Sequence, residues 1–114
     1  MNDRQLLESA AKAAGIDLQE DICSTQMWIR EKPGDLSGLV WNPLTDDGDA
    51  LRLAVKLGMT VNVEADIGAV CATAGWIDGA CLPEAAGTEA LGADPYAATR
   101  RAIVRAAAAL GEQA

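Results

Sequence analysis

A run of aspartates in the first half of the chain is a candidate for binding a metal ion. Asp46, Asp47 and Asp49 offer carboxylate oxygens, which are ligands that calcium prefers. A calcium loop of the EF type also needs a glutamate about twelve positions from its first ligand, and Leu57 stands there. The start of a helix explains the same aspartates, because the helix dipole favours negative charge at that end. We therefore interpret this run as structural.

The chain contains no histidine, which removes the usual general base, the commonest metal ligand and nucleophiles that histidine activates. Cys23, Cys71 and Cys81 are scattered, so they favour reduced thiols over a zinc site, while a disulfide between Cys71 and Cys81 stays open. The glycine-rich segments 75–79 and 87–92 lack the spacing of a phosphate-binding loop. We expect no catalytic residue, no metal and no cofactor, and we expect that the protein is not an enzyme.

The candidate binding residues are three arginines and two tryptophans. Arg100, Arg101 and Arg105 form a basic cluster in an acidic chain. They fit either a solvated helix face that pairs with acidic neighbours, or a contact patch for a protein partner or a second copy of the chain. Trp41 and Trp76 are candidate contacts, because tryptophan contributes a large area with little flexibility. A core or loop-anchoring role is the alternative for Trp41.

Length and charge limit the classes of function. The 114 residues fit one domain, residues 1–114. The net charge of −8 argues against direct binding of nucleic acid. No apolar stretch reaches the ~20 residues that a membrane span needs, and charges near the N-terminus argue against a signal peptide. We expect a cytoplasmic protein, whose acidity serves solubility or imitates DNA.

A first helix is predicted over residues 2–14. Asn2 and Gln5 have the spacing of a capping box, and Gly15 is a natural stop. The residues of its expected buried stripe are Leu6, Leu7, Ala10, Ala11 and Ala14.

A second helix is predicted over residues 46–57, with Thr45 or Asp46 as its N-cap, Pro43 just before it and Gly58 as its stop. Its expected inward residues are Leu51, Ala54 and Val55, and its expected solvent-facing residues are Arg52 and Lys56.

The last helix is the clearest. Asp94 is an N-cap, Pro95 takes the first helical position, and good helix formers continue to Gly111. The residues of one expected stripe are Tyr96, Ile103, Ala107 and Leu110, and the three arginines lie on another.

Two hairpins are predicted between these helices. The first joins strands at 25–31 and 36–41 through a Pro-Gly turn at 32–35, after a connection at 16–24. The second follows the middle helix. It begins with a half-buried strand at 59–65, whose inward residues are Val61, Val63 and Ala65, and it returns at 69–74. Residues 75–93 form either a long loop or one further strand near 76–82.

Three segments resemble the phage ABA sandwich domain family. They are Trp41–Leu57 (WNPLTDDGDALRLAVKL), Asp94–Ala107 (DPYAATRRAIVRAA) and the opening Met1–Gly15. The resemblance implies a small protein of a phage or prophage with α-β-α layers and an unknown biochemical role. It supplies no catalytic residues.

The sequence therefore predicts an α+β fold in which a small antiparallel or mixed β-sheet is sandwiched between helices, in the order helix, hairpin, helix, hairpin, helix. We expect an accessory protein that acts by binding a phage or host protein and that has no chemistry of its own. The alternative is an acidic inhibitor, or DNA mimic, that targets a host nucleic-acid-binding protein.

Overall fold

The computed structural model describes residues 2–16, 18–20, 27–29, 39–76 and 83–112. For 18–20, 27–29, 39–40, 74–76 and 83–85 it describes the backbone alone. The fold is α+β, and its elements in chain order are α1 (Asp3–Ala14), β1 (Leu18–Glu20), β2 (Met27–Ile29), β3 (Leu39–Val40), α2 (Asp47–Lys56), β4 (Thr60–Glu64), β5 (Ala69–Trp76), β6 (Pro83–Ala90) and α3 (Pro95–Glu112).

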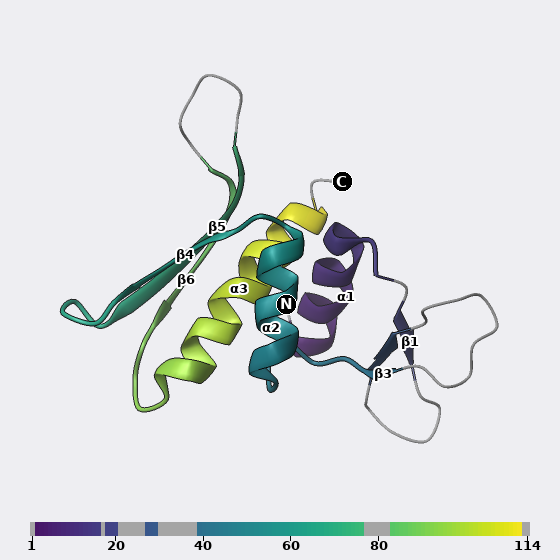
Figure 1. Cartoon of the computed structure of the whole chain (residues 1–114), viewed down its shortest axis with the longest axis horizontal. Coiled ribbons are helices and arrows are strands. Elements are labelled where there is room, and N and C mark those ends of the chain that lie inside the picture. The colour runs from purple at the N-terminus through teal and green to yellow at the C-terminus, as the bar shows by residue number, and fades with distance from the viewer. Residues whose placement is uncertain (1, 17, 21–26, 30–38, 77–82, 113–114) are drawn as a thin grey trace.

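Helix α3 is the central element of the described fold (Figure 1). The sheet of β4, β5 and β6 packs on one side of α3, through β5 and β6, and helices α1 and α2 pack elsewhere on α3. The described layers are therefore sheet, then α3, then α1 and α2. This differs from the predicted sandwich, which has the sheet in the middle. The difference arises because the alanine-rich α3 buries a wide surface rather than a single stripe.

The predicted start, stop and buried stripe of the first helix are confirmed. The Asn2 side chain accepts a hydrogen bond from the Gln5 backbone N–H at 2.8 Å, and the Gln5 side chain accepts one from the Asn2 N–H at 3.0 Å. Gly15 ends the helix with a φ of +68°. The stripe residues Leu6, Leu7, Ala10, Ala11 and Ala14 are all buried.

Helix α2 begins where the sequence places it, but its inward face is different. Asp46, not Thr45, is the N-cap. Leu51 and Val55 are 64% and 72% exposed, so their predicted burial is wrong. The buried residues are Ala50, Leu53 and Ala54. Both sets have helical spacing, so hydrophobicity alone could not choose between them.

Helix α3 begins as predicted, with the Asp94 carboxylate accepting hydrogen bonds from the Tyr96 and Ala97 backbone N–H groups, both at 3.1 Å. Its buried residues are Ala102, Ile103, Val104, Ala106, Ala107, Ala108 and Gly111. Tyr96 is 71% exposed and Leu110 is half-buried, so the expected single stripe is only partly right. Tyr96 lies in the first turn of the helix.

Two glycines mark where backbones approach α3 most closely. A Cβ atom on Gly87 of β6 would overlap the carbonyl oxygen of Ala102, and one on Gly111 of α3 would overlap the carbonyl oxygen of Ser9 in α1. Neither position has room for a side chain. Glycine at these two places therefore allows α3 to pack against both its sheet and its helix neighbour.

The second sheet has one strand more than the predicted hairpin. β4 and β5 pair antiparallel, as predicted, with Glu64 opposite Ala69 at the turn. β5 also pairs antiparallel with β6, which spans Pro83–Ala90. Of the two alternatives left open for residues 75–93, a long loop or a further strand near 76–82, the structure therefore shows a further strand, at a later position. β6 is made largely of alanine, glycine, threonine and glutamate, so it lacks the alternation of large apolar residues that indicates a strand.

Strand β4 is not half-buried as predicted, because all five of its residues are exposed. Val61 and Val63 are 36% and 49% exposed. Helix α3 lies against β5 and β6, and β4 forms the edge of the sheet beyond it.

The first sheet is a small one with the order β1-β2-β3, and all its pairs are antiparallel. The pairing of β2 with β3 confirms the predicted hairpin in a shorter form. Residues 18–20 were predicted as part of a connection and instead form β1. The predicted Pro-Gly turn at 32–35 lies outside the described residues.

Candidate functional site

The loop before α2 is held by its own backbone and side chains. Trp41 is 3% exposed and Pro43 is fully buried, so both belong to the core. The Asn42 N–H donates to Asp49 Oδ2 at 3.0 Å, and Asn42 Oδ1 accepts from the Leu44 N–H at 3.0 Å. Trp41 is therefore a core residue, which is the second of the two roles that the sequence left open for it.

The aspartates at the start of α2 have the structural partners that their positions predict. Asp46 Oδ2 accepts a hydrogen bond from the Asp49 N–H at 2.8 Å. Arg52 pairs with Asp49 at 2.6 Å and lies 3.8 Å from Asp46. In the described ranges, no group of three or more cysteine, aspartate or glutamate residues is arranged to hold a metal ion.

The three arginines do not act as one patch. Arg100 turns toward the loop before α2, where its Nε donates to the Leu44 carbonyl oxygen at 2.9 Å and its Nη1 pairs with Asp47 at 2.5 Å. Its side chain is 16% exposed. Arg100 therefore joins α3 to the start of α2 and is largely withdrawn from the surface.

Arg101 and Arg105 share one acidic neighbour. Glu89 of β6 lies 2.6 Å from Arg105 Nη1 and 3.6 Å from Arg101 Nε. Arg101 also pairs with Asp3 of α1 at 3.2 Å, and Arg105 donates to the Thr88 carbonyl oxygen at 3.3 Å. These carboxylates offset the charge of both guanidinium groups. Both arginines thus pair with acidic neighbours of the same chain, which is one of the two alternatives that the sequence left open.

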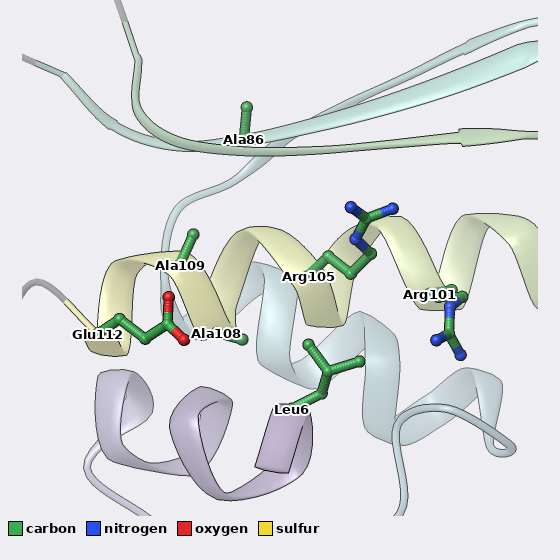
Figure 2. Close-up of a pocket in the computed structure, with 7 residues that line it drawn as sticks. All are labelled: Leu6, Ala86, Arg101, Arg105, Ala108, Ala109 and Glu112. Carbon is green, nitrogen blue, oxygen red and sulfur yellow. The ribbon is translucent and has the colours of Figure 1, made fainter. Parts of the chain in front are cut away.

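An open pocket of about 410 Å³ lies beside these two arginines, along α3 and between β6 and α1 (Figure 2). Its lining residues are Leu6, Ala86, Arg101, Arg105, Ala108, Ala109 and Glu112. Arg105 extends toward β6 and Arg101 toward α1 (Figure 2). The pocket offers hydrogen-bond donors, one carboxylate and small apolar groups. These groups suit contact with a polar group of a partner, and none of them is a nucleophile of the serine or cysteine kind.

The remaining candidate residues lie partly outside the described side chains. Trp76 ends β5, but the structure describes its backbone alone. Cys71 is a free, half-buried thiol 3.6 Å from the hydroxyl of Thr88. Cys81 lies outside the described residues. The disulfide between Cys71 and Cys81 that the sequence left open therefore involves a residue outside the described ranges.

Exposed apolar residues are the feature that sequence reasoning missed. Leu51 and Val55 lie one helical turn apart on α2, so they share a face. Val61 and Val63 lie on β4, and the other large exposed apolar residues of the described chain are Ile67 and Tyr96. The sequence patterns place five of these six on an inward face or stripe, all except Ile67. Only the packing of α3 shows that they are outside.

Within the described part of the chain, no polar or charged residue is buried, and no helix has the length and apolar character to cross a membrane.

No protein-family model, curated protein or solved structure matches the chain.

Proposed function

We propose that this chain is an accessory protein of a phage or prophage that acts in the cytoplasm of the bacterial host by binding another protein. The proposal includes membership of the phage ABA sandwich domain family. It rests on the three segments that resemble the family and not on the layers, because the described sheet packs against α3 with α1 and α2 elsewhere on α3. It assigns no reaction, metal or cofactor to the chain.

The observation that carries the proposal is the exposed pair Leu51 and Val55. Both lie in Trp41–Leu57, the longest of the three segments that resemble the family. The packing of the described residues accounts for Trp41, for the caps and for Leu53 in that segment, but it leaves these two apolar side chains in water. Exposed apolar side chains that share one face are typical of protein contacts. We therefore assign the partner's contact to this face of α2.

Arg101 and Arg105 offer a second contact, through the pocket along α3. Their side chains are about half exposed, and their guanidinium groups pair with Glu89. Held side chains lose less entropy on binding than free ones. This contact would recognise a polar group of the same partner.

The acidic surface supports the alternative, an inhibitor that imitates DNA, less well. Several carboxylates pair with arginines of the same chain, namely Asp3, Asp46, Asp47, Asp49 and Glu89. Their charge is partly offset before a partner arrives. A mimic needs carboxylates that are free to replace phosphates at a basic surface.

The test is affinity purification of the tagged chain from cells that carry the phage or prophage. We expect a phage-encoded protein to be retained by the wild type and lost with the double variant Leu51→Gln/Val55→Gln. Ile67→Gln is the matched control, because Ile67 is 67% exposed and lies in the turn between β4 and β5. Equal thermal unfolding of the three proteins excludes misfolding as the cause.

Retention of the same protein by the double variant would remove the α2 face from the proposal. Recovery of a basic host DNA-binding enzyme in place of a phage protein would favour the mimic. The double variant Arg101→Glu/Arg105→Glu tests the second contact, and undiminished capture would show that these arginines serve only the fold.

A further inference from the structure

The free edge of strand β4 is the strongest feature that the proposed function leaves unexplained. β4 is the first strand in the order β4-β5-β6, so one of its edges pairs with β5 and the other has no partner strand among the described residues. All five of its residues are exposed. Such an edge presents a row of unpaired N–H and C=O groups that can template another strand.

This edge lacks most of the features by which proteins protect edge strands, and its one charged residue, Glu64, stands at its end. Its sequence is Thr60-Val-Asn-Val-Glu64, without lysine or proline. Its five residues pair with β5 in an unbroken register, so the strand contains no bulge. Lysine, proline and bulges are the usual protections against pairing between edges.

Val61 and Val63 add an apolar surface beside the edge. They lie opposite Ala72 and Val70, which are 0% and 1% exposed. Residues opposite each other in an antiparallel pair point to the same face of the sheet. The two valines therefore continue the apolar face that packs on α3, at the point where α3 no longer covers it.

We propose that β4 pairs antiparallel with β4 of a second copy of this chain, about a two-fold axis at Asn62. In this register each Val61 lies opposite the other copy's Val63, and each Glu64 lies opposite the other copy's Thr60. The two three-stranded sheets become one sheet of six strands. The apolar faces of both sheets then join across the two-fold axis.

Charge favours this arrangement over its alternatives. Parallel pairing in register would set Glu64 against the other copy's Glu64, and like charges directly opposite are destabilising. The antiparallel register instead sets each Glu64 opposite a neutral Thr60 of the other copy, so like charges do not face each other. β4 thus pairs with a second copy of itself so that its valines meet and its one charged residue faces threonine, which supports a second copy as its occupant rather than an unrelated peptide.

The net charge of −8 on each copy opposes the dimer through repulsion between the two molecules. Salt screens this repulsion, with a Debye length of about 10 Å at 0.1 M. The dimer is therefore expected to become tighter as the salt concentration rises, whereas an association driven by ion pairs would weaken.

Sedimentation of the purified chain over a range of concentrations tests the proposal. We expect a monomer–dimer equilibrium whose dissociation constant rises at least tenfold in Val63→Lys. Val55→Lys is the matched control, because it places the same charge on an exposed valine of α2 away from this edge. A chain that stays monomeric at all concentrations, or a dimer that Val63→Lys leaves intact, would overturn the proposal.

The register has its own test. Under a mild oxidant, Asn62→Cys is expected to form a disulfide between the two copies of residue 62, identified by peptide mass spectrometry. Glu64→Cys is the control, since each copy of residue 64 faces residue 60 and not itself. Equal cross-linking at 62 and 64 would contradict the two-fold register. Both experiments use the chain alone, so their failure leaves the proposed partner binding on α2 unaffected.

Discussion

Arg100 of helix α3 donates a hydrogen bond from its Nε to the carbonyl oxygen of Leu44, a residue 56 positions earlier in the chain, at 2.9 Å. The same guanidinium group pairs with Asp47 in the first turn of α2. One side chain thus satisfies a loop carbonyl and holds a carboxylate at a helix start. The arginine cluster of the sequence therefore divides into one structural residue and two residues beside a pocket.

The first prediction concerns this division. Arg100→Ala is expected to lower the free energy of unfolding by about 1–3 kcal/mol, because it removes a charged hydrogen bond to a partly buried carbonyl. Arg101→Ala is expected to cost less than about 1 kcal/mol, since its ion pairs are solvent-exposed. Urea unfolding of the two variants measures both values. An equal decrease in the free energy of unfolding of both variants would show that Arg100 stabilises the fold no more than Arg101 does.

A second prediction concerns Trp41, the buried tryptophan of the loop before α2. Trp41→Ala is expected to destabilise the protein by about 3–5 kcal/mol, as truncation of a buried aromatic residue usually does. Tyr96→Ala, at a residue that is 71% exposed, should change stability by less than about 0.5 kcal/mol. Thermal and urea unfolding measure the stability of both variants relative to the wild type. A mild effect of Trp41→Ala would return this residue to the list of binding contacts.

The third prediction concerns the close approach of β6 to α3. Gly87→Ala is expected to destabilise the fold by more than about 2 kcal/mol, because the added methyl group overlaps the backbone of α3. Gly48→Ala is its control. There the added Cβ would lie 3.2 Å from the guanidinium nitrogens of Arg52 and from Asp46 Oδ2, which are ends of side chains that can shift by a few tenths of an ångström, and alanine favours a helix more than glycine does. We expect this control to be neutral or stabilising by up to ~1 kcal/mol in the same unfolding experiment.

The elements that the sequence predicted best are those with signals from local chemistry. The capping box of Asn2 and Gln5 and the Asp94-Pro95 start each depend on residues within one helical turn, so they could be identified without knowledge of the rest of the fold. The antiparallel pairing of β4 with β5 also depends on neighbours in the chain. These features were correctly predicted.

The features that were missed depend on contacts between distant segments. The rotation of α2 is fixed by the bond between Asp49 and the Asn42 backbone and by packing on α3, and the hydrophobic pattern permits two faces. β6 is a strand because β5 pairs with it and α3 covers it, not because its residues favour strands. For the same reason the sequence placed Val61 and Val63 in the core. Because the sequence patterns also placed Leu51 and Val55 of α2 in the core, they did not indicate an exposed apolar surface on either element.

Helix α3 is the last element of the chain to be synthesised among those described, yet α1, the first, packs directly on it. The apolar stripe of α1 therefore has nothing to cover it while the intervening residues leave the ribosome. The chain then depends on contacts between its two ends, which form slowly because a long loop must close first. We expect that removal of α3 by a protease would expose the buried residues of both α1 and α2. The remaining chain would then unfold, and no shorter folded protein would be left.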